Sequence, residues 1–358
     1  MQKTNFSKPP PFLKPKDAIC LIAPSGIIEP NSIEYAVEWI MKNDFMPRVG
    51  IHLTDNFYRF AATDKHRLFD LQKALDCEES KAIWCIRGGY GMGRILDKLN
   101  WDKFLENPKW LIGFSDITAI HLKVSQLGFQ SMHGFMPVQF KYLYQPKTNL
   151  ETQKAFTNSQ KIQIQQSKKG EKGVKNALKQ GTNEITDKIY IEKSIQSFLD
   201  ALLGKSYQIS SKPHEKNKLG QKEKIEGEII GGNLSMIINS LATPTEINTD
   251  NKILFLEEVG ENLYSIDRML WQLYRAGKLK NLKGLVVGSF SGSKQTAQQF
   301  GFSVEQMIID LVKEYDYPVA FDFPIGHTAQ NETVICGATV VFEVNKDGGS
   351  LKFLQNPD

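Results

Sequence analysis

The sequence lacks the features that mark several large classes of protein. It contains only four cysteines in 358 residues, and none of them forms a C-x-x-C pair, so we expect neither a disulfide framework nor a zinc site. Cys20, Cys85 and Cys336 lie within apolar runs, which is typical of buried free thiols in a reducing compartment. No segment supplies the roughly 18 consecutive apolar residues of a membrane helix, and the N-terminal residues lack the apolar core of a signal peptide. We therefore expect a cytoplasmic protein without a membrane partner.

Strong charge of either sign is also missing. The chain has 44 Lys and Arg residues against 40 Asp and Glu residues, which gives a net charge of +4. The lysines gather in a polar stretch rather than alternating with aromatic residues, so no nucleic-acid partner is expected. The hydrophobic content of 41% is ordinary for a globular protein, and the length allows two domains, each with its own core.

Short apolar runs alternate with helical patterns in the first part of the chain, and we assign residues 13–143 to an N-terminal domain. Strands are expected at residues 18–23, 82–86 and 110–114, and helices at residues 33–41, 66–74, 94–99 and 117–127. Because alternating strands and helices form parallel sheets covered by helices, this pattern predicts a doubly wound α/β sheet. The functional site of such a sheet is expected at the carboxyl ends of its strands.

A polar segment follows, and we interpret residues 144–224 as a linker or insertion that contains a short helix. Residues 144–192 are rich in Gln, Lys, Asn, Ser and Thr and have little to bury. Isoleucines alternate with polar residues at 162–164 and 189–191, which predicts a surface hairpin. The short helix is expected at residues 194–203.

The remaining residues, 225–358, alternate strands with helices again, and we assign them to a C-terminal domain. Strands are expected up to Gly232 and at residues 252–257 and 285–290, and helices from Asn233 and at residues 264–276 and 303–315. The end of the chain predicts a hairpin that pairs residues 333–336 with residues 339–344 around Gly337 and Ala338.

Ser115 stands on the predicted turn between a strand and a helix. A hydroxyl there points outward at the carboxyl end of the sheet, and the first backbone N–H groups of the helix face the same position. This is the layout of a nucleophile elbow, in which the serine attacks a carbonyl carbon. The G-x-S-x-G motif is incomplete, because Ile117 occupies the position of its second glycine. The alternative interpretation is that Ser115 only caps the helix.

A glycine-rich loop, with Gly88, Gly89, Gly91 and Gly93, follows the strand at residues 82–86. Its spacing matches neither the dinucleotide-binding motif nor the P-loop. A tight turn that requires positive φ is one explanation for the glycines. The other explanation is that glycine allows a backbone N–H to approach Ser115 from the neighbouring strand end and to hold an oxyanion.

Polar residues also follow strands in the C-terminal domain. Glu257 and Glu258 come at the carboxyl end of a strand, where a carboxylate either orients a catalytic base or caps the next helix. His327 lies just past a strand on a loop bounded by Pro and Gly, where a histidine either serves as a general base or has a structural role. Asn233 opens a helix, as an N-cap or as a ligand of the substrate.

Taken together and in this order, these stretches resemble the LD-carboxypeptidase family of serine peptidases. This family includes the muramoyltetrapeptide carboxypeptidases of peptidoglycan recycling and the microcin C resistance peptidases. The matching stretches are residues 22–26, 62–64 with Arg67, 87–91, 113–118, 231–235, 256–261 with Asp267 and Arg268, and 324–327. The polar stretch at 144–192 is longer than the family usually carries, which bears on how the domains dock.

The resemblance implies a fold and a catalytic triad. The fold would combine an N-terminal flavodoxin-like domain, a doubly wound parallel sheet that carries the nucleophile, with a C-terminal α/β domain of the swivelling type. Ser115 would be the nucleophile, His327 the general base and Glu257 the acid that orients the imidazole. Glu257 is preferred over Glu258 because the family places the triad acid first in this pair.

The resemblance also implies the remaining parts of the site. Backbone N–H groups of Gly88, Gly89 and Asp116 would form the oxyanion hole. Such a site needs no metal, nucleotide or other cofactor, and the family suggests a homodimer.

The implied activity is hydrolysis of an L,D peptide bond that releases the terminal D-Ala from murein tetrapeptide. Because a carboxypeptidase binds a free carboxylate, for which arginine is the natural bidentate partner, Arg87, Arg94 and Arg268 are candidate substrate ligands. Asn233 is a further candidate. One alternative is a peptidase of the microcin C type that cleaves amide or acyl links to a modified nucleotide with the same triad. Another is a non-catalytic module that binds an anion or a nucleotide.

Overall fold

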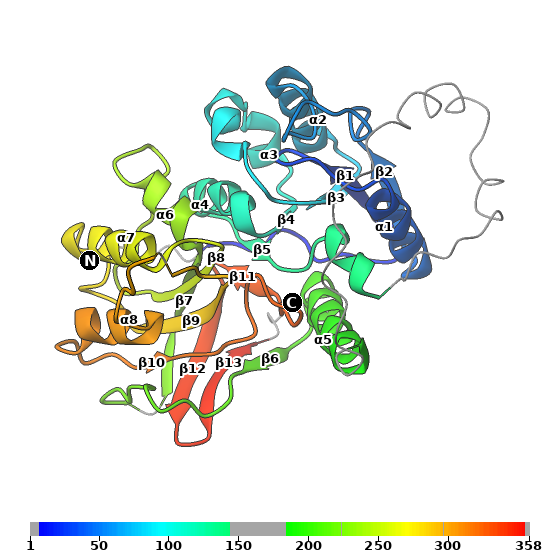
Figure 1. Ribbon diagram of the computed structural model, residues 1–358. Coiled ribbons are helices and arrows are strands. Elements are labelled where there is room, and N and C mark those ends of the chain that lie inside the picture. The colour runs from blue at the N-terminus through cyan, green and yellow to red at the C-terminus, as the bar shows by residue number, and fades with distance from the viewer. Residues whose placement is uncertain (1–6, 144–183, 223, 296, 355–358) are drawn as a thin grey trace.

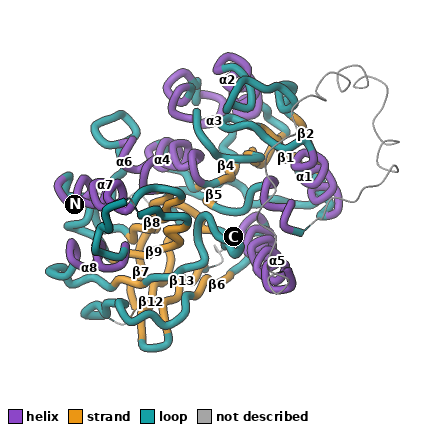
Figure 2. Tube along the Cα trace, viewed as in Figure 1, coloured by secondary structure: helices purple, strands orange, loops and turns teal. Residues whose placement is uncertain are grey.

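The computed structural model describes residues 7–143, 184–222, 224–295 and 297–354. Its strands form two sheets that lie side by side, with helices packed around them (Figure 1; Figure 2). In the described residues, no helix is long and apolar enough to cross a membrane.

The first sheet has the order β11-β5-β4-β3-β1-β2. Its strands are β1 (Ala18–Ile22), β2 (Met46–Val49), β3 (Ser80–Cys85), β4 (Trp110–Gly113), β5 (Ser131–His133) and β11 (Val334–Cys336). The order β2-β1-β3-β4-β5 is all parallel and is that of flavodoxin-like folds. Because β1 and β4 are buried along their whole length, they are apolar runs rather than alternating patterns.

Helices cover both faces of this sheet, as a doubly wound fold requires. The helices of this part are α1 (Asn31–Lys42), α2 (Asp64–Asp76), α3 (Asp102–Glu106), α4 (Thr118–Gln126) and the 3₁₀ turns η1 (Met92–Arg94), η2 (Leu96–Lys98), η3 (Ser115–Ile117) and η4 (Pro137–Tyr142). Helix α1 shares one core with the sheet, and α2, α3 and α4 share another. The prediction of a helix at residues 94–99 is wrong, because this short segment forms two 3₁₀ turns instead.

The second sheet is mixed and has the order β10-β9-β8-β7-β12-β13-β6. Its strands are β6 (Tyr207–Ser210), β7 (Lys224–Asn233), β8 (Ile253–Val259), β9 (Gly284–Ser291), β10 (Val319–Ala320), β12 (Thr339–Asn345) and β13 (Gly348–Phe353). Strands β7 to β10 are parallel, and the other three are antiparallel. Helices α6 (Leu234–Ser240), α7 (Leu263–Arg275) and α8 (Val304–Val312) share one core with the parallel part. These two α/β sheets confirm the predicted fold class.

The predicted C-terminal hairpin is wrong. Strand β11 pairs antiparallel with β5 of the first sheet, whereas β12 pairs with β7 and β13 of the second (Figure 1). The chain passes from one sheet to the other at Gly337, whose φ of 88° suits glycine. Two short strands joined by two residues resemble a hairpin in sequence. Instead, β11 pairs with the distant β5, and β12 pairs with the distant β7 and with the next strand, β13.

The second strand of the hairpin predicted in the polar segment is wrong, because its residues lie in helix α5 (Glu184–Leu202). Residues 189–191 belong to this helix, and residues 162–164 lie outside the described residues. Ile191 and Phe198 are buried against the first sheet, and the ring of Phe198 lies 4.9 Å from that of Trp84 between centroids. The segment from residue 184 therefore packs on the first sheet and then supplies β6 to the second. The three domain ranges remain an interpretation.

Candidate active site

Ser115 occupies a strained turn between β4 and α4. Its φ is 66°, in the left-handed region that serine rarely adopts. Gly113 makes the preceding bend with a φ of 155°, and a side chain there would lie 3.0 Å from Ile117. No side chain caps η3 or α4, so Ser115 does not serve as the cap that the alternative interpretation assumed. Strain of this kind is characteristic of a nucleophile held outward on a sharp turn.

The glycine loop lies directly against Ser115. A Cβ on Gly88 would stand 2.8 Å from Ser115 Cβ and 2.9 Å from the Phe114 carbonyl oxygen, so only glycine fits. The Gly26 N–H donates to the Gly88 carbonyl at 2.9 Å, which fixes the loop from the other side. Among the described residues, the N–H groups of Gly88 and Gly89 donate to no protein acceptor. These two donors are therefore available to a ligand beside Ser115.

The Asp116 side chain is hydrogen-bonded to the backbone of the glycine loop. Its carboxylate is buried and accepts a hydrogen bond from the Met92 N–H at 2.7 Å. Burial raises the pKa of this carboxyl, and the nearby positive charges of Arg67 and Arg59 oppose that rise. Arg67 is itself buried and donates to the Gly91 carbonyl at 2.9 Å. The loop is thus held by buried charged side chains while its backbone faces Ser115.

His327 and Glu257 form a close pair. His327 Nδ1 lies 2.7 Å from Glu257 Oε2, and the Glu257 side chain is fully buried. The His327 ring meets the Phe114 ring edge-on with centroids 4.8 Å apart, which places the imidazole next to the turn that carries Ser115. In the described residues no hydrogen bond joins Ser115 to His327, as is common before a substrate is bound. The triad candidates are therefore gathered at the junction of the two sheets.

Gly326 belongs to this site, although no motif in the sequence singles it out. Its φ is 102°, and a Cβ on it would lie 2.5 Å from Glu257 Oε2. The Gly326 N–H donates to Asn331 Oδ1 at 2.8 Å, and the Asn331 N–H donates to Ser194 Oγ at 2.8 Å. Helix α5 thus braces the loop that carries His327. This contact joins residues far apart in the chain, and no local pattern indicates it.

Glu258 and Asn233 have structural partners. Glu258 accepts hydrogen bonds from Asn233 Nδ2 at 2.9 Å and from the Ser235 hydroxyl at 2.6 Å. Asn233 Oδ1 accepts from the Met236 N–H at 3.3 Å, which makes Asn233 the N-cap of α6. The two neighbouring glutamates therefore face different groups, and only Glu257 reaches the imidazole. The Asn233 side chain is occupied by its own turn, which is the capping role left open from the sequence.

The three candidate arginines lie in different surroundings. Arg87 donates to the Ile27 carbonyl at 2.8 Å. Arg94 forms an ion pair with Asp64 at 2.9 Å. Arg268 lies on α7, with its guanidinium carbon 5.6 Å from the centre of the Tyr264 ring. None of the three is brought into contact with Ser115 or His327 by a hydrogen bond in the described residues.

His121 lies beneath the Ser115 turn. It is buried, and its two ring nitrogens lie 2.8 Å from the Gly113 carbonyl oxygen and 2.9 Å from Ser131 Oγ. Since a carbonyl only accepts, Nε2 carries the proton and Nδ1 accepts from the serine hydroxyl. Burial lowers the pKa of His121 to about 4. This neutral histidine therefore connects β4, α4 and β5 under the nucleophile.

One group among the described residues could offer metal ligands: His52, Asp55 and His66. Asp55 Oδ2 lies 3.1 Å from His52 Nδ1 and 2.7 Å from His66 Nδ1. The rings stack with centroids 3.8 Å apart and planes at 14°. A zinc ion would have to lie about 2.0–2.1 Å from both nitrogens and in both ring planes, which nearly parallel rings do not allow. The arrangement fits a carboxylate that accepts a hydrogen bond from each ring.

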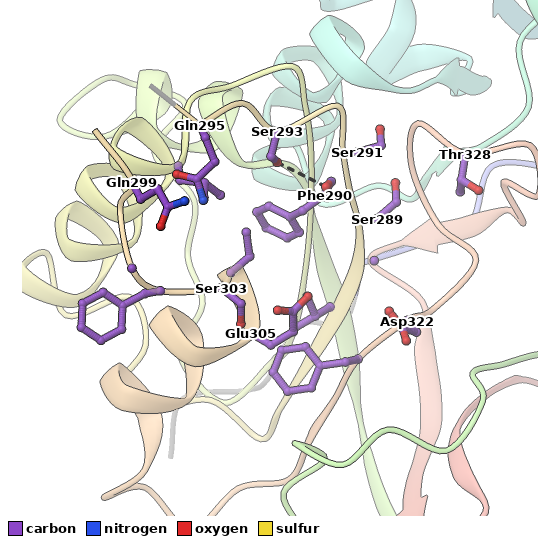
Figure 3. A pocket seen from close by; sticks show the side chains of 17 residues that line it. Ser289, Phe290, Ser291, Ser293, Gln295, Gln299, Ser303, Glu305, Asp322 and Thr328 are labelled. Carbon is purple, nitrogen blue, oxygen red and sulfur yellow. Dashed lines mark hydrogen bonds between the residues drawn. The ribbon is translucent and has the colours of Figure 1, made fainter. Parts of the chain in front are cut away.

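A cavity of about 750 Å³ opens in the second sheet at the carboxyl end of β9 (Figure 3). Ser289 and Ser291 line it from β9, Ser303 and Glu305 from the start of α8, and Thr328 from the loop that follows His327. The Ser291 hydroxyl donates to the His327 carbonyl at 2.8 Å, so the wall of the cavity supports the backbone of the candidate base. No pattern in the sequence indicates this cavity.

The chain matches known proteins over nearly its whole length. The model of the LD-carboxypeptidase N-terminal domain matches residues 19–134, and that of the LD-carboxypeptidase C-terminal domain matches residues 226–342. The chain is 28% identical over 353 residues to a "probable murein peptide carboxypeptidase" of Bacillus subtilis, with 96% of this chain and 97% of the relative covered. It is 27% identical over 333 residues to the "murein tetrapeptide carboxypeptidase" of Pseudomonas aeruginosa, with 92% and 94% covered.

Solved structures show the same fold. The muramoyltetrapeptide carboxypeptidase from Oxalobacter formigenes aligns with a TM-score of 0.72 at 22% identity and covers 95% of this chain and 100% of its own. MccF in complex with glutamyl sulfamoyl guanosine aligns with a TM-score of 0.74 at 15% identity, with 98% and 99% covered. Fold and matches together define a two-domain α/β peptidase. The chain belongs to the LD-carboxypeptidase family, as the sequence motifs predict.

Proposed function

We propose that the protein is a serine-type carboxypeptidase that hydrolyses the L,D peptide bond of murein tetrapeptide and releases the terminal D-Ala. The observation that carries the proposal is the 2.7 Å contact of His327 with the buried Glu257, beside the strained turn of Ser115. The curated relatives named murein peptide and murein tetrapeptide carboxypeptidase support the choice of substrate.

The proposed chemistry gives Ser115, His327 and Glu257 one role each: nucleophile, general base and orienting acid. Because Nδ1 of His327 faces Glu257, its Nε2 is left to take the proton of the Ser115 hydroxyl. The hydroxyl oxygen attacks the carbonyl carbon of the L,D bond, and the imidazolium then gives the proton to the leaving amine of D-Ala. Water hydrolyses the ester on Ser115 in a second round, with His327 again as the base.

The oxyanion of each tetrahedral intermediate needs donors that are already in place. The N–H groups of Gly88 and Gly89 have no protein acceptor in the described residues, and Gly88 touches Ser115. We assign the oxyanion hole to these donors together with the N–H of Asp116, which follows the nucleophile. Fixed donors of this kind contribute about 3–4 kcal/mol each to the stability of the transition state.

Mass spectrometry of purified protein incubated with murein tetrapeptide tests the proposal, with a Ser115→Ala variant as control. We expect loss of one alanine from the peptide with the wild-type protein only. If neither protein releases alanine but a fluorophosphonate labels Ser115, the chemistry stands and the substrate is another, with aminoacyl sulfamoyl adenosine the next to try. If Ser115 is not labelled, the proposal fails in favour of a binding module.

We also propose that the enzyme works as a cytoplasmic homodimer, as the family resemblance implies. Light scattering after gel filtration measures the mass in solution, and a mass of one chain would contradict the dimer. Fractionation of cells with an antibody to the protein tests the compartment.

A further inference from the structure

A carboxypeptidase that releases one residue must recognise a carboxylate close to the bond it cuts. In a terminal alanine the carboxylate carbon is separated from the scissile nitrogen only by Cα. The cationic residue that binds this carboxylate must therefore belong to an element next to the oxyanion donors. Arg94 directly follows the glycine loop, but its guanidinium is already paired with Asp64. Arg268 lies on α7 of the other half of the protein, over Tyr264, and is not next to these donors.

Arg59 is rooted on a loop that touches the glycine loop. Phe57 and Phe60 exchange backbone hydrogen bonds of 3.1 and 3.0 Å, which leaves Tyr58 and Arg59 at the tip of a tight turn. The Ile27 N–H donates to the Arg59 carbonyl at 3.1 Å. The preceding residue, Gly26, donates its N–H to Gly88 at 2.9 Å. Two backbone contacts therefore connect Arg59 to the residue that lies against Ser115.

The side chain of Arg59 points along the same loop. Its guanidinium carbon lies 5.2 Å from the centre of the Tyr90 ring, and Tyr90 directly follows Gly89. An aromatic face holds a guanidinium by cation–π attraction without neutralising its charge. Both residues are exposed, so a ligand can reach them.

The Arg59 guanidinium acts on buried Asp116 only through its electric field and is not neutralised by a direct ion pair within the described residues. In the part of the chain that the structure describes, no carboxylate forms an ion pair or hydrogen bond with it. Arg87 approaches from the other side, since one of its NH₂ groups donates to the carbonyl of Ile27, the residue whose N–H binds Arg59. Arg87 too has no carboxylate partner among the described residues. Two arginines without acidic partners thus flank Ile27 at the edge of the glycine loop.

We propose that Arg59, held by the Tyr90 ring and assisted by Arg87, binds the terminal carboxylate of the peptide substrate. The inference rests on the proposed function, because it assigns the specificity of that same site. It names a residue that the motifs of the sequence did not single out, and it makes Arg59 the residue that distinguishes a free C-terminus from a blocked one.

Binding measured without turnover separates this inference from the proposed function. Calorimetry on a Ser115→Ala protein would compare murein tetrapeptide with its C-terminal amide, in the presence and absence of Arg59→Gln. We expect Arg59→Gln to weaken binding of the acid by about 10- to 100-fold and to change binding of the amide by less than about threefold, the effect of removing one charge-assisted hydrogen-bonding partner. Arg59→Lys should restore part of the difference, because it keeps the charge but loses the bidentate geometry.

Arg48→Gln is the matched control, since Arg48 is an exposed arginine of the same half of the protein that pairs with Glu79 at 3.7 Å. It should leave both affinities unchanged. The inference is overturned if the Arg59-containing protein does not prefer the acid, or if Arg59→Gln weakens acid and amide equally. Release of D-Ala by the protein with Ser115 intact tests the proposed function separately, and its result does not depend on the outcome of the binding experiment.

Discussion

The two halves of the candidate site are built in different ways. On the side of the first sheet, backbone makes the site: Ser115 has a φ of 66°, and Gly88 leaves no room for a side chain beside it. On the side of the second sheet, side chains make the site, through the 2.7 Å contact of His327 with the buried Glu257. The conformation of each backbone turn depends on residues nearby in the sequence, whereas the contact of His327 with Glu257 depends on the tertiary fold. The difference predicts which substitutions are tolerated on each side.

Ser115→Ala should have the largest effect, because it removes the only proposed nucleophile and leaves the turn intact. We expect release of D-Ala to fall by about 10⁴- to 10⁶-fold, as for other serine triads. Alanine release followed by mass spectrometry measures the loss, and the urea midpoint checks that the fold is unchanged. Turnover within about tenfold of the wild type would contradict the triad.

Glu257→Gln and Glu258→Gln separate catalysis from structure on the side-chain-built half. Glu257→Gln should lower kcat by about 10³- to 10⁴-fold, because a neutral amide no longer stabilises the imidazolium. Glu258→Gln should cost about 1–3 kcal/mol of unfolding free energy through its bonds to Asn233 and Ser235, with a much smaller loss of kcat. The assignment of Glu257 fails if the two variants lose kcat equally.

Gly88→Ala tests the backbone-built half. An added Cβ would stand 2.8 Å from Ser115 Cβ, so either the loop or the serine must move, and we expect kcat to fall by about 10²- to 10³-fold, as when one oxyanion donor is lost. Gly93→Ala is the control from the same loop, because its nearest neighbour would be Asn239 Oδ1 at 3.8 Å. Equal activity of the two variants would show that the loop does not contribute donors.

The smallest expected effect concerns stability and comes from His121 under the nucleophile turn. Its pKa of about 4 in the folded protein lies below that of an exposed histidine, because burial penalises the charged form. The unfolded chain therefore binds the proton first, so this stability is present above about pH 6.5 and is lost as the pH falls toward 4.

Between about pH 7 and about pH 5, His121 should account for a loss of about 2 kcal/mol in unfolding free energy. Urea unfolding at both pH values gives the change in unfolding free energy for the wild type and for His121→Gln. The difference between the two proteins is the contribution of His121. The variant should show a smaller pH dependence even if it is less stable throughout. An unchanged slope would assign the acid sensitivity to other groups.

The same contrast explains what the sequence could predict. The strand–turn–helix passage around Ser115 and the doubly wound parallel sheet follow from local patterns, and the structure confirms the fold class. The cysteines at 20, 85 and 336 are buried and free, as their apolar surroundings indicate. Features decided by distant contacts could not be predicted in this way.

Two examples show the physical reason. Residues 189–191 alternate like a strand, yet they belong to α5, because Ile191 and Phe198 are buried in the same core, where the Phe198 ring lies beside Trp84. A short apolar run cannot be assigned to strand or helix by period alone. Likewise, the role of Gly326 beside Glu257 depends on a contact between residues far apart in sequence.

The crossing of β11 into the first sheet affects how this protein could be recombined with its relatives. In register, Gly113 of β4 lies beside His133 of β5, and His133 lies beside Val334 of β11. The segment that carries His327 is therefore fastened, a few residues later, to the sheet that carries Ser115. In a chimera whose residues after 224 come from a relative, the relative's β11 would pair with this protein's β5. The relative's base would then lie beside this protein's Ser115. To preserve the pairing of β5 with β11, a chimera must exchange the first sheet together with β11.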